Sequence, residues 1–272
     1  MPTERFAAEW LALREPADHR ARAAALEQRL ALAGARAGWR RILDLGCGTG
    51  ANLRHLAPRL PWARDWTLID HDADLLARLT PPTECSVCLQ PMLGDLHTDG
   101  LAAVARAEVV TASALLDLVS AAWLDDLIGR IHARGAAALF TLSYDGRVAW
   151  SGPADADDDW MRALVNRHQR TDKGLGAALG PDAAAHACTR FRALGYDCTL
   201  APSPWRLQGS ADTALATAWL EGWAQAAAAL VPTQGRHQGE RIQAWCERRR
   251  AAFTSGGTAL EVGHLDLLAL PI

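Results

Sequence analysis

Short apolar runs alternate with longer segments of helical period along most of this 272-residue chain. The run from Ile42 to Leu45 is the clearest predicted strand, because it is apolar apart from one acid and ends at a glycine-rich turn. The same pattern predicts further strands over 66–70, 85–89, 108–112, 136–143, 195–200 and 260–270. Helical spacing predicts helices over 52–60, 73–79, 101–106, 121–133, 160–170, 181–194, 213–230 and 238–253. Strands that alternate with helices in this way predict an α/β fold.

The segment before the first strand is also predicted to be helical. Residues 1–15 are amphipathic, and Glu15-Pro16 is expected to end that segment. Asp18 is a good N-cap for a second helix over 21–32.

The stretch from Asp44 to Asn52 carries the first candidate site. Gly46, Gly48 and Gly50 alternate between the first strand and the helix that Asn52 opens. Glycine suits positions where the backbone turns with positive φ, or where a ligand lies against bare main chain. We therefore predict a ligand pocket at this strand end, facing the N–H groups of a helix N-terminus.

Two ligand classes use this geometry. Dinucleotide sites use G-x-G-x-x-G/A, which Gly46, Gly48 and Ala51 fit. A dinucleotide brings pyrophosphate to the helix end and has no use for a carboxylate such as Asp44 there. S-adenosylmethionine (SAM) brings an ammonium group, which an acid beneath the loop can hold directly or through water. Asp44 therefore favours SAM.

An acid followed by G-x-G-x-G resembles the first motif of the class I SAM-dependent methyltransferases. The resemblance covers about residues 40–145 and extends to 181–201 and 260–270. It implies a single domain over 1–272 with a Rossmann-like, mostly parallel sheet of seven strands in the order 3-2-1-4-5-7-6. The last strand would be antiparallel, and helical insertions would interrupt the pattern.

Two further acids extend the candidate SAM site. Asp70 ends the second predicted strand, where a carboxylate can accept hydrogen bonds from both ribose hydroxyls, as it does in NAD enzymes too. His71 follows it and is a candidate contact for the adenine. The resemblance implies that Asp95 accepts a hydrogen bond from the adenine amino group while the Leu96 N–H binds a ring nitrogen. The alternative for Asp95 is a helix cap.

The remaining candidate residues flank the position of the methyl group. The resemblance implies a helix before the first strand that covers the SAM pocket, and Arg22 is our candidate for binding the methionine carboxylate; a solvated arginine is the alternative. Ser113 begins the segment that leaves the fourth strand over the methyl donor. Asp117, in the same segment, is the leading candidate for a general base or orienting group, with a helix-cap acid as the alternative.

The segment 113–119 also bears on the acceptor. It lacks Asn/Asp-Pro-Pro-Tyr/Phe for nitrogen methylation of bases or amides and a Pro-Cys nucleophile for pyrimidine carbon methylation. With Lys173 as the single lysine, no polar tetrad for ribose methylation is found. We therefore predict a small-molecule acceptor, covered by the N-terminal segment 1–38 and by helical insertions over 146–176 and 205–258.

Composition and short motifs bear on partners, metal binding and location. The net charge of −3 does not favour a general nucleic-acid binder. Cys85 and Cys88 form C-x-x-C without a second pair or a nearby histidine, and the acids at 155–159 suit a helix N-terminus better than a metal, so no metal is expected. No signal peptide or membrane span is found, and we expect a soluble, cytoplasmic protein. The oligomeric state is not predicted.

The sequence thus predicts a methyltransferase that uses SAM to methylate a small molecule. A SAM-binding regulatory protein without turnover and an NAD-dependent oxidoreductase are the alternatives. Asp44 and Asp95 argue against the oxidoreductase, whereas nothing in the sequence excludes the regulatory protein.

Overall fold

A single twisted sheet runs through the computed structural model, which describes residues 7–82, 86–231 and 236–272. Its strands follow the order β3-β2-β1-β4-β5-β8-β6, and the short strand β7 pairs with β8. β8 is antiparallel to both of its neighbours, whereas β1 to β5 are parallel to one another. The strands are β1 (Arg41–Leu45), β2 (Asp65–Asp70), β3 (Cys88–Leu93), β4 (Val109–Ser113), β5 (Ala137–Trp150), β6 (Tyr196–Pro202), β7 (Trp205–Leu207) and β8 (Leu260–Pro271).

This order confirms the predicted sheet. The last predicted strand, β8, lies antiparallel between β5 and β6, which is the position predicted for the seventh strand. The eighth strand in the count is β7, which the sequence pattern did not predict because only three residues form it.

The third strand was predicted over 85–89, but β3 starts at Cys88 and continues to Leu93. The prediction stopped before Pro91, which lacks an N–H to donate. β3 lies at the edge of the sheet, where a proline is tolerated. Cys85 lies outside the described residues.

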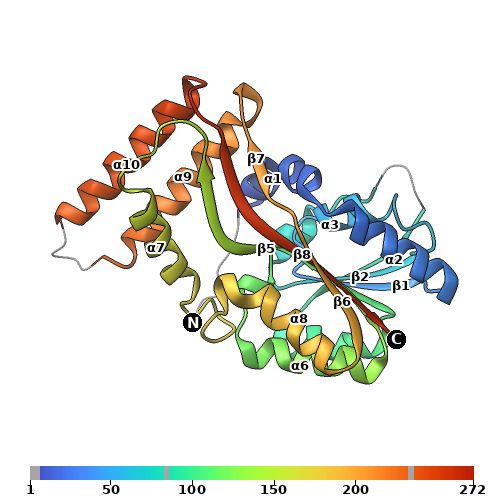
Figure 1. Ribbon diagram of the computed structural model, residues 1–272. Coiled ribbons are helices and arrows are strands. Elements are labelled where there is room, and N and C mark those ends of the chain that lie inside the picture. Colours follow the sequence, from blue (N-terminus) through green and yellow to red (C-terminus); the bar gives the residue numbers. More distant parts are fainter. Residues whose placement is uncertain (1–6, 83–85, 232–235) are drawn as a thin grey trace.

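The fifth strand was predicted over 136–143, but β5 continues to Trp150. Gly146 has a φ of +83°, and the register with β8 shifts between Tyr144 and Val148 before pairing resumes. The two strands therefore continue together beyond the parallel part of the sheet, as Figure 1 shows for the long, curved β5 and β8.

Helices cover both faces of the parallel strands. Leu43 and Leu45 of β1 pack with α6 (Ala121–Arg134) and α8 (Ala183–Ala193), whereas Ile42 packs with α2 (Ala24–Ala37) and α3 (Ala51–Leu56). This division follows from the alternation of side chains along a strand. The Ser120 side chain caps α6 by accepting a hydrogen bond from the Trp123 N–H. The shorter helices are α4 (Ala73–Ala77) and α5 (Leu101–Ala103).

The N-terminal helices differ from the prediction. α1 (Ala8–Ala21) includes Pro16, and the chain breaks only at Arg22 and Ala23. Asp18 is therefore not an N-cap: it lies buried on α1, where it accepts hydrogen bonds from Arg14 and Trp205. Its contacts explain why the helix continues past the proline, since the part of α1 after Pro16 is held against β7.

A third layer of helices packs on the extended ends of β5 and β8. It consists of α7 (Asp158–Gln169), α9 (Thr213–Ala228) and α10 (Arg236–Thr254), which share one apolar cluster with β7 (Figure 1). The acids that precede and open α7 pair with arginines of α10, as Asp155 does with Arg248 and Asp158 with Arg249. They therefore hold two helices together, in addition to lying at a helix N-terminus.

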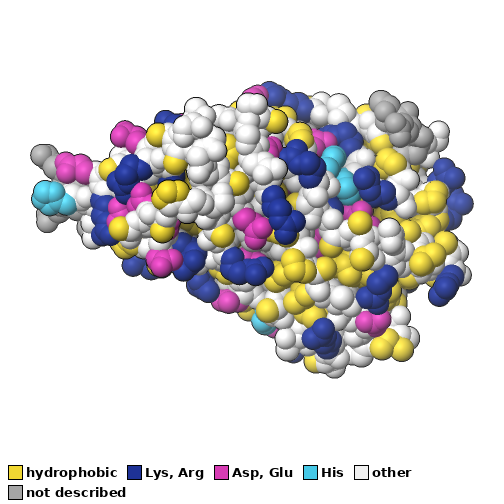
Figure 2. Space-filling view, turned by 45° about the horizontal axis from the view of Figure 1, so that its top comes forward, with side chains coloured by type: hydrophobic (Ala, Val, Ile, Leu, Met, Phe, Trp, Pro, Cys, Tyr) yellow, Lys and Arg dark blue, Asp and Glu magenta, His cyan; other side chains and the backbone are white. Residues whose placement is uncertain are grey.

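The described ranges contain no helix with both the length and the apolar character needed to cross a membrane. Nor do they contain a group of three or more histidine, cysteine or acidic side chains placed to hold a metal ion. Arginines and acids are interspersed over the face drawn in Figure 2.

Candidate functional site

The glycine-rich turn after β1 has the predicted backbone. Gly46, Gly48 and Gly50 have φ values of +64°, +54° and +86°, a region that other residues rarely adopt. The Gly48 N–H donates to Oδ2 of Asp70 over 2.7 Å, so the turn after β1 is fixed to the end of β2. A Cβ added at Gly48 would lie 3.0 Å from the Leu11 side chain of α1, so a larger residue would require that side chain to move.

Asp44 lies beneath this turn and is fully buried. Asn52 Nδ2 donates to Asp44 Oδ1 over 2.8 Å and lies 3.1 Å from the Thr111 hydroxyl. Burial raises the pKa of Asp44 to about 7, although the Asn52 hydrogen bond and the charge of Arg22 act to lower it. Asp44 Oδ2 has no hydrogen-bond partner within the described chain, which leaves one carboxylate oxygen for a further donor.

Arg22 lies behind this group and does not line either of the cavities described below. Its Nη1 donates to Asn52 Oδ1 over 2.9 Å, and its Nε lies 3.3 Å from Glu27 and 3.8 Å from Asp266. These contacts connect Arg22 to the glycine-rich turn through Asn52. Its direct contact with a methionine carboxylate stays a prediction.

Asp70 and His71 lie at the end of β2, as predicted. Asp70 is buried and also accepts from the Asp72 N–H over 3.0 Å. His71 Nδ1 lies 3.5 Å from Asp70 Oδ1, and its Nε2 is buried without a hydrogen-bond partner in the described ranges. This end of β2 therefore offers a carboxylate and an unsatisfied imidazole nitrogen side by side.

Asp95 caps a single π-helical turn, Leu96–Gly100. Its Oδ1 accepts from the His97 N–H over 2.6 Å, and its side chain is exposed. The capping alternative for Asp95 is thus seen in the structure. Asp95 does not line a cavity, whereas Leu96 does.

A cavity of about 150 Å³ lies against the glycine-rich turn. Of the residues predicted to bind SAM, it is lined by Gly46, Gly48, Asn52, Asp70, His71, Leu96 and Ser113. Asp44, Gly50, Arg22 and Asp95 are not among the residues that line it. Seven candidate residues from separate parts of the sequence therefore line one cavity. Helix α1 adds Leu11, Arg14 and Asp18 to its lining.

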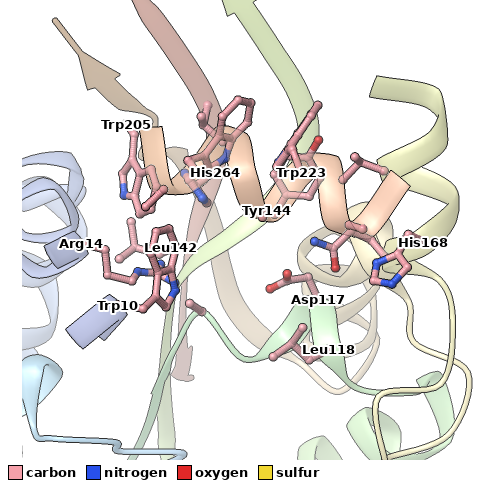
Figure 3. A pocket seen from close by; sticks show the side chains of 18 of the residues that line it. Trp10, Arg14, Asp117, Leu118, Leu142, Tyr144, His168, Trp205, Trp223 and His264 are labelled. Carbon is pink, nitrogen blue, oxygen red and sulfur yellow. The ribbon is translucent and has the colours of Figure 1, made fainter. Parts of the chain in front are cut away.

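A larger cavity of about 520 Å³ adjoins the first. Arg14, Ala114, Leu118 and Lys173 line both. Asp117 lies in the 3₁₀ turn Leu116–Leu118, is 7% exposed and lines the larger cavity, whereas Ser120 caps the helix that follows. In Figure 3, Trp10, Arg14 and Trp205 lie on one side of this cavity and His168 on the other, with Asp117 between them.

Two residues with strained backbone line the larger cavity. Ala114 and Leu142 have φ values of +52° and +55°, which are uncommon for residues with a side chain. The Ala114 N–H donates to the Thr141 carbonyl over 2.9 Å, and the Leu142 N–H donates to Asp266 over 2.8 Å. Backbone strain of this kind costs of order 1–3 kcal/mol per residue and often occurs at functional sites.

Several residues of the larger cavity were not predicted as site residues. Tyr144 and His264 lie on paired strands, and Trp205, Trp219 and Trp223 come from β7 and α9. Burial, and secondarily the charge of Arg14, lowers the pKa of His264 to about 3, so its imidazole is neutral. The density of tryptophan in residues 205–245 was the sequence signal that could have indicated these rings.

No protein-family model matches this sequence, and no curated protein matches it. Solved structures do match. A cyclopropane-fatty-acyl-phospholipid synthase-like protein from Lactobacillus casei ATCC 334 is 15% identical over 99% of this chain and 96% of that one, with a TM-score of 0.53. A SAM-dependent methyltransferase from Geobacter sulfurreducens in complex with S-adenosyl-L-homocysteine (SAH) is 18% identical over 98% of this chain and 99% of that one, with a TM-score of 0.45.

Human N-acetylserotonin methyltransferase in complex with SAM is 16% identical over 69% of this chain, with a TM-score of 0.41, and the match spans only 48% of that protein. At these identities a match shows the fold alone. Of these three structures, the Lactobacillus casei protein has the highest TM-score. The strand order and this match together show the α/β fold that the resemblance to class I methyltransferases predicted: a mostly parallel sheet with one long antiparallel strand near its edge and helical insertions.

Proposed function

We propose that this protein transfers a methyl group from SAM to a small molecule held in the larger cavity. The observation that carries the proposal is that the two cavities adjoin at Ala114 and Leu118. The smaller cavity is lined by the glycine-rich turn and Asp70, and the larger one by residues of several helices and strands. A donor in the first and an acceptor in the second would meet at their junction.

The residues present suit SAM chemically. Asp44 Oδ2 and His71 Nε2 are buried polar atoms without partners in the described chain, and a ligand with donors and acceptors would satisfy them. Asp70 is a candidate for the ribose hydroxyls, and Asp44 for the ammonium group, directly or through water. The smaller cavity alone is below the roughly 300–1,000 Å³ of typical ligand sites, so a bound SAM would extend toward the larger one.

When bound, SAM supplies a methyl group on a positively charged sulfur, which needs no further activation. The protein then contributes mainly by holding the acceptor in line and excluding water. Helices α1 and α9 contribute residues to the wall of the larger cavity, and opening of such a cover would admit the acceptor. Asp117 would orient the acceptor or take its proton if the attacking atom carries one.

Titration calorimetry with SAM, SAH and NAD tests the donor. We expect SAM and SAH to bind in the micromolar range and NAD not to bind. Binding of NAD without SAM would favour an oxidoreductase and overturn the proposal.

A screen for methyl incorporation into small metabolites then tests turnover. We expect at least one low-molecular-weight acceptor to be methylated. If SAM binds but no metabolite is methylated, the regulatory alternative becomes the better function.

A further inference from the structure

We infer that the acceptor is a planar aromatic molecule, a conclusion that rests on the proposed function and adds the chemical class of its substrate. The inference comes from the side chains around the larger cavity. Six rings from five different elements follow one another around its wall: Trp10, Trp205, His264, Tyr144, Trp223 and Trp219.

The rings form one unbroken series of contacts. Trp10 and Trp205 have centroids 6.4 Å apart, and His264 lies 5.2 Å beyond Trp205. Tyr144 lies 6.3 Å from His264 and meets Trp223 edge-on at 6.5 Å. Trp219 ends the series, 4.3 Å from Trp223. Figure 3 shows the labelled members of this series around the cavity. A wall of this kind offers ring faces and edges, which favour another ring as their partner.

The polar ends of two wall residues are already used. The Trp205 indole N–H donates to Asp18 over 2.9 Å, and the Tyr144 hydroxyl donates to Asn166 over 2.9 Å. These bonds fix the ring orientations and use both donors, so neither the indole N–H nor the O–H is left to donate to the substrate. The raised pKa of Tyr144, due mainly to burial, keeps its hydroxyl protonated. The substrate would therefore contact Trp205 through its ring carbons, and Tyr144 through its ring carbons or by donating to its hydroxyl oxygen.

The charges beside the wall argue against a cationic acceptor at its Trp10 end. The Arg14 guanidinium carbon lies 4.9 Å from the Trp205 ring centroid and 5.9 Å from that of Trp10. The ring faces of Trp10 and Trp205 that would receive an ammonium group are thus already occupied by the Arg14 guanidinium. Arg14 in turn forms an ion pair with Asp18 at 2.9 Å. His264 adds a neutral imidazole to this end. An uncharged arene fits these surroundings better than an aliphatic amine.

A matched pair of probes tests the inference. Affinities of the full-length protein for 1-naphthol and for its saturated counterpart decahydro-1-naphthol are measured by calorimetry with SAH present. The two share a carbon skeleton and a hydroxyl and differ in aromaticity. We expect 1-naphthol to bind at least tenfold more tightly. Decanoate, added as a third probe, is expected to bind more weakly than 1-naphthol.

Variants then locate the site. Trp223→Leu, which keeps an apolar side chain but removes the ring, should weaken 1-naphthol binding at least fivefold, and Trp223→Phe should restore most of it. Both should leave SAH affinity unchanged. Trp39→Leu is the control, because Trp39 packs on Trp62 and lines neither cavity.

The outcomes separate this inference from the proposed function. Equal binding of the two naphthols, tighter binding of decanoate, or no detectable 1-naphthol binding would overturn the aromatic acceptor even where SAH binds normally. An unchanged 1-naphthol affinity in Trp223→Leu would also overturn it, as would a loss that Trp223→Phe does not restore. Failure of the wild-type protein to bind SAH would instead remove the proposed function.

Discussion

The smaller cavity is lined chiefly by residues that follow three neighbouring parallel strands, β1, β2 and β4, whereas the larger one takes its lining from helices and strands spread over most of the chain. In the first, three short loops meet because the carboxyl ends of parallel strands lie at one edge of the sheet. In the second, rings from α1, β5, β7, α9 and β8 meet only after the whole chain has folded. The proposed donor site thus forms from short loops at neighbouring strand ends, whereas the proposed acceptor site forms from residues that are far apart in the sequence.

The two sides also differ in what holds them. Around the glycine-rich turn, the contacts are short hydrogen bonds among Asp44, Asn52 and Asp70 and the main chain. Around the larger cavity, helices α7 and α10 are joined by ion pairs between residues more than 80 positions apart. Substitutions around the glycine-rich turn should therefore lower SAM affinity. Substitutions around the larger cavity should first lower the stability of the fold.

The largest effect is expected from Gly48→Val. Valine is strained at a φ of +54°, and its Cβ would lie 3.0 Å from Leu11 Cδ1. We expect SAH affinity to fall at least about a hundredfold by calorimetry, with the circular dichroism spectrum retained. Gly129→Ala is the control, since a Cβ there meets nothing within 4 Å. Undiminished SAH affinity in folded Gly48→Val would show that this turn is not the donor site.

Asp70→Ala should weaken SAM binding by roughly 1.5–3 kcal/mol, the range for hydrogen bonds to a charged group. The change removes the candidate acceptor for the ribose hydroxyls and the Gly48 N–H contact together. Asp74→Ala, an exposed acid on the next helix, should have no effect on the same titration. Equal SAM affinities of the Asp70 variant and the wild type would show that SAM does not bind at the end of β2.

On the acceptor side, Asp158→Ala should lower the free energy of unfolding by roughly 1–3 kcal/mol in urea. Asp158 accepts hydrogen bonds from Arg249 Nε and Trp245 Nε1, both at 2.9 Å, and the change leaves a buried arginine without its carboxylate. Asp159→Ala is the neighbouring control, because Asp159 is 88% exposed and paired only at the surface. SAH affinity should stay within twofold; a much larger loss would argue that the two sides do not behave separately.

A pH dependence of stability is expected from Asp44, and it is spread over several pH units. Its folded-state pKa of about 7 is above the unfolded value near 4, so the folded state binds more protons between these pH values. Stability from this group is therefore present below about pH 4 and is lost as the pH rises to 7. The slope approaches about 1.4 kcal/mol per pH unit at most.

We expect Asp44→Asn to remove this contribution, measured as the wild-type-minus-variant difference in unfolding free energy against pH. Asp74→Asn serves as the control. A difference that is flat from pH 4 to 7, or that grows more favourable to the wild type as the pH rises, would contradict the raised pKa.

The contrast between the two sides also explains what the sequence could predict. The glycine-rich turn and Asp70 lie next to strand ends whose apolar pattern was clear, so their meeting followed from the strand order. The predicted end of the fifth strand at residue 143 was wrong because Gly146 interrupts the strand pattern locally, whereas pairing with β8 continues beyond it. The helix end predicted at Pro16 was wrong for the same reason, because the contact of Asp18 with β7 cannot be read from the local sequence.

The acceptor site was predictable only in outline. The cover was inferred from segments not needed for the sheet, and α1, α7 and α9 do contribute to the larger cavity. The individual rings were not predicted, since which tryptophans face a cavity depends on helix orientation in the folded chain. Leu142 could not be found either, because its positive φ depends on the contact with Asp266, 124 residues away.

A crystal structure with SAH bound tests the proposed donor and acceptor sites most directly. We expect the SAH ribose to lie at Asp70 and its sulfur to lie near Ala114 and Leu118, facing the larger cavity and enclosed by α1, α7 and α9. A sulfur that opens onto a broad, exposed surface, with these helices elsewhere, would contradict a small acceptor and favour a macromolecular one.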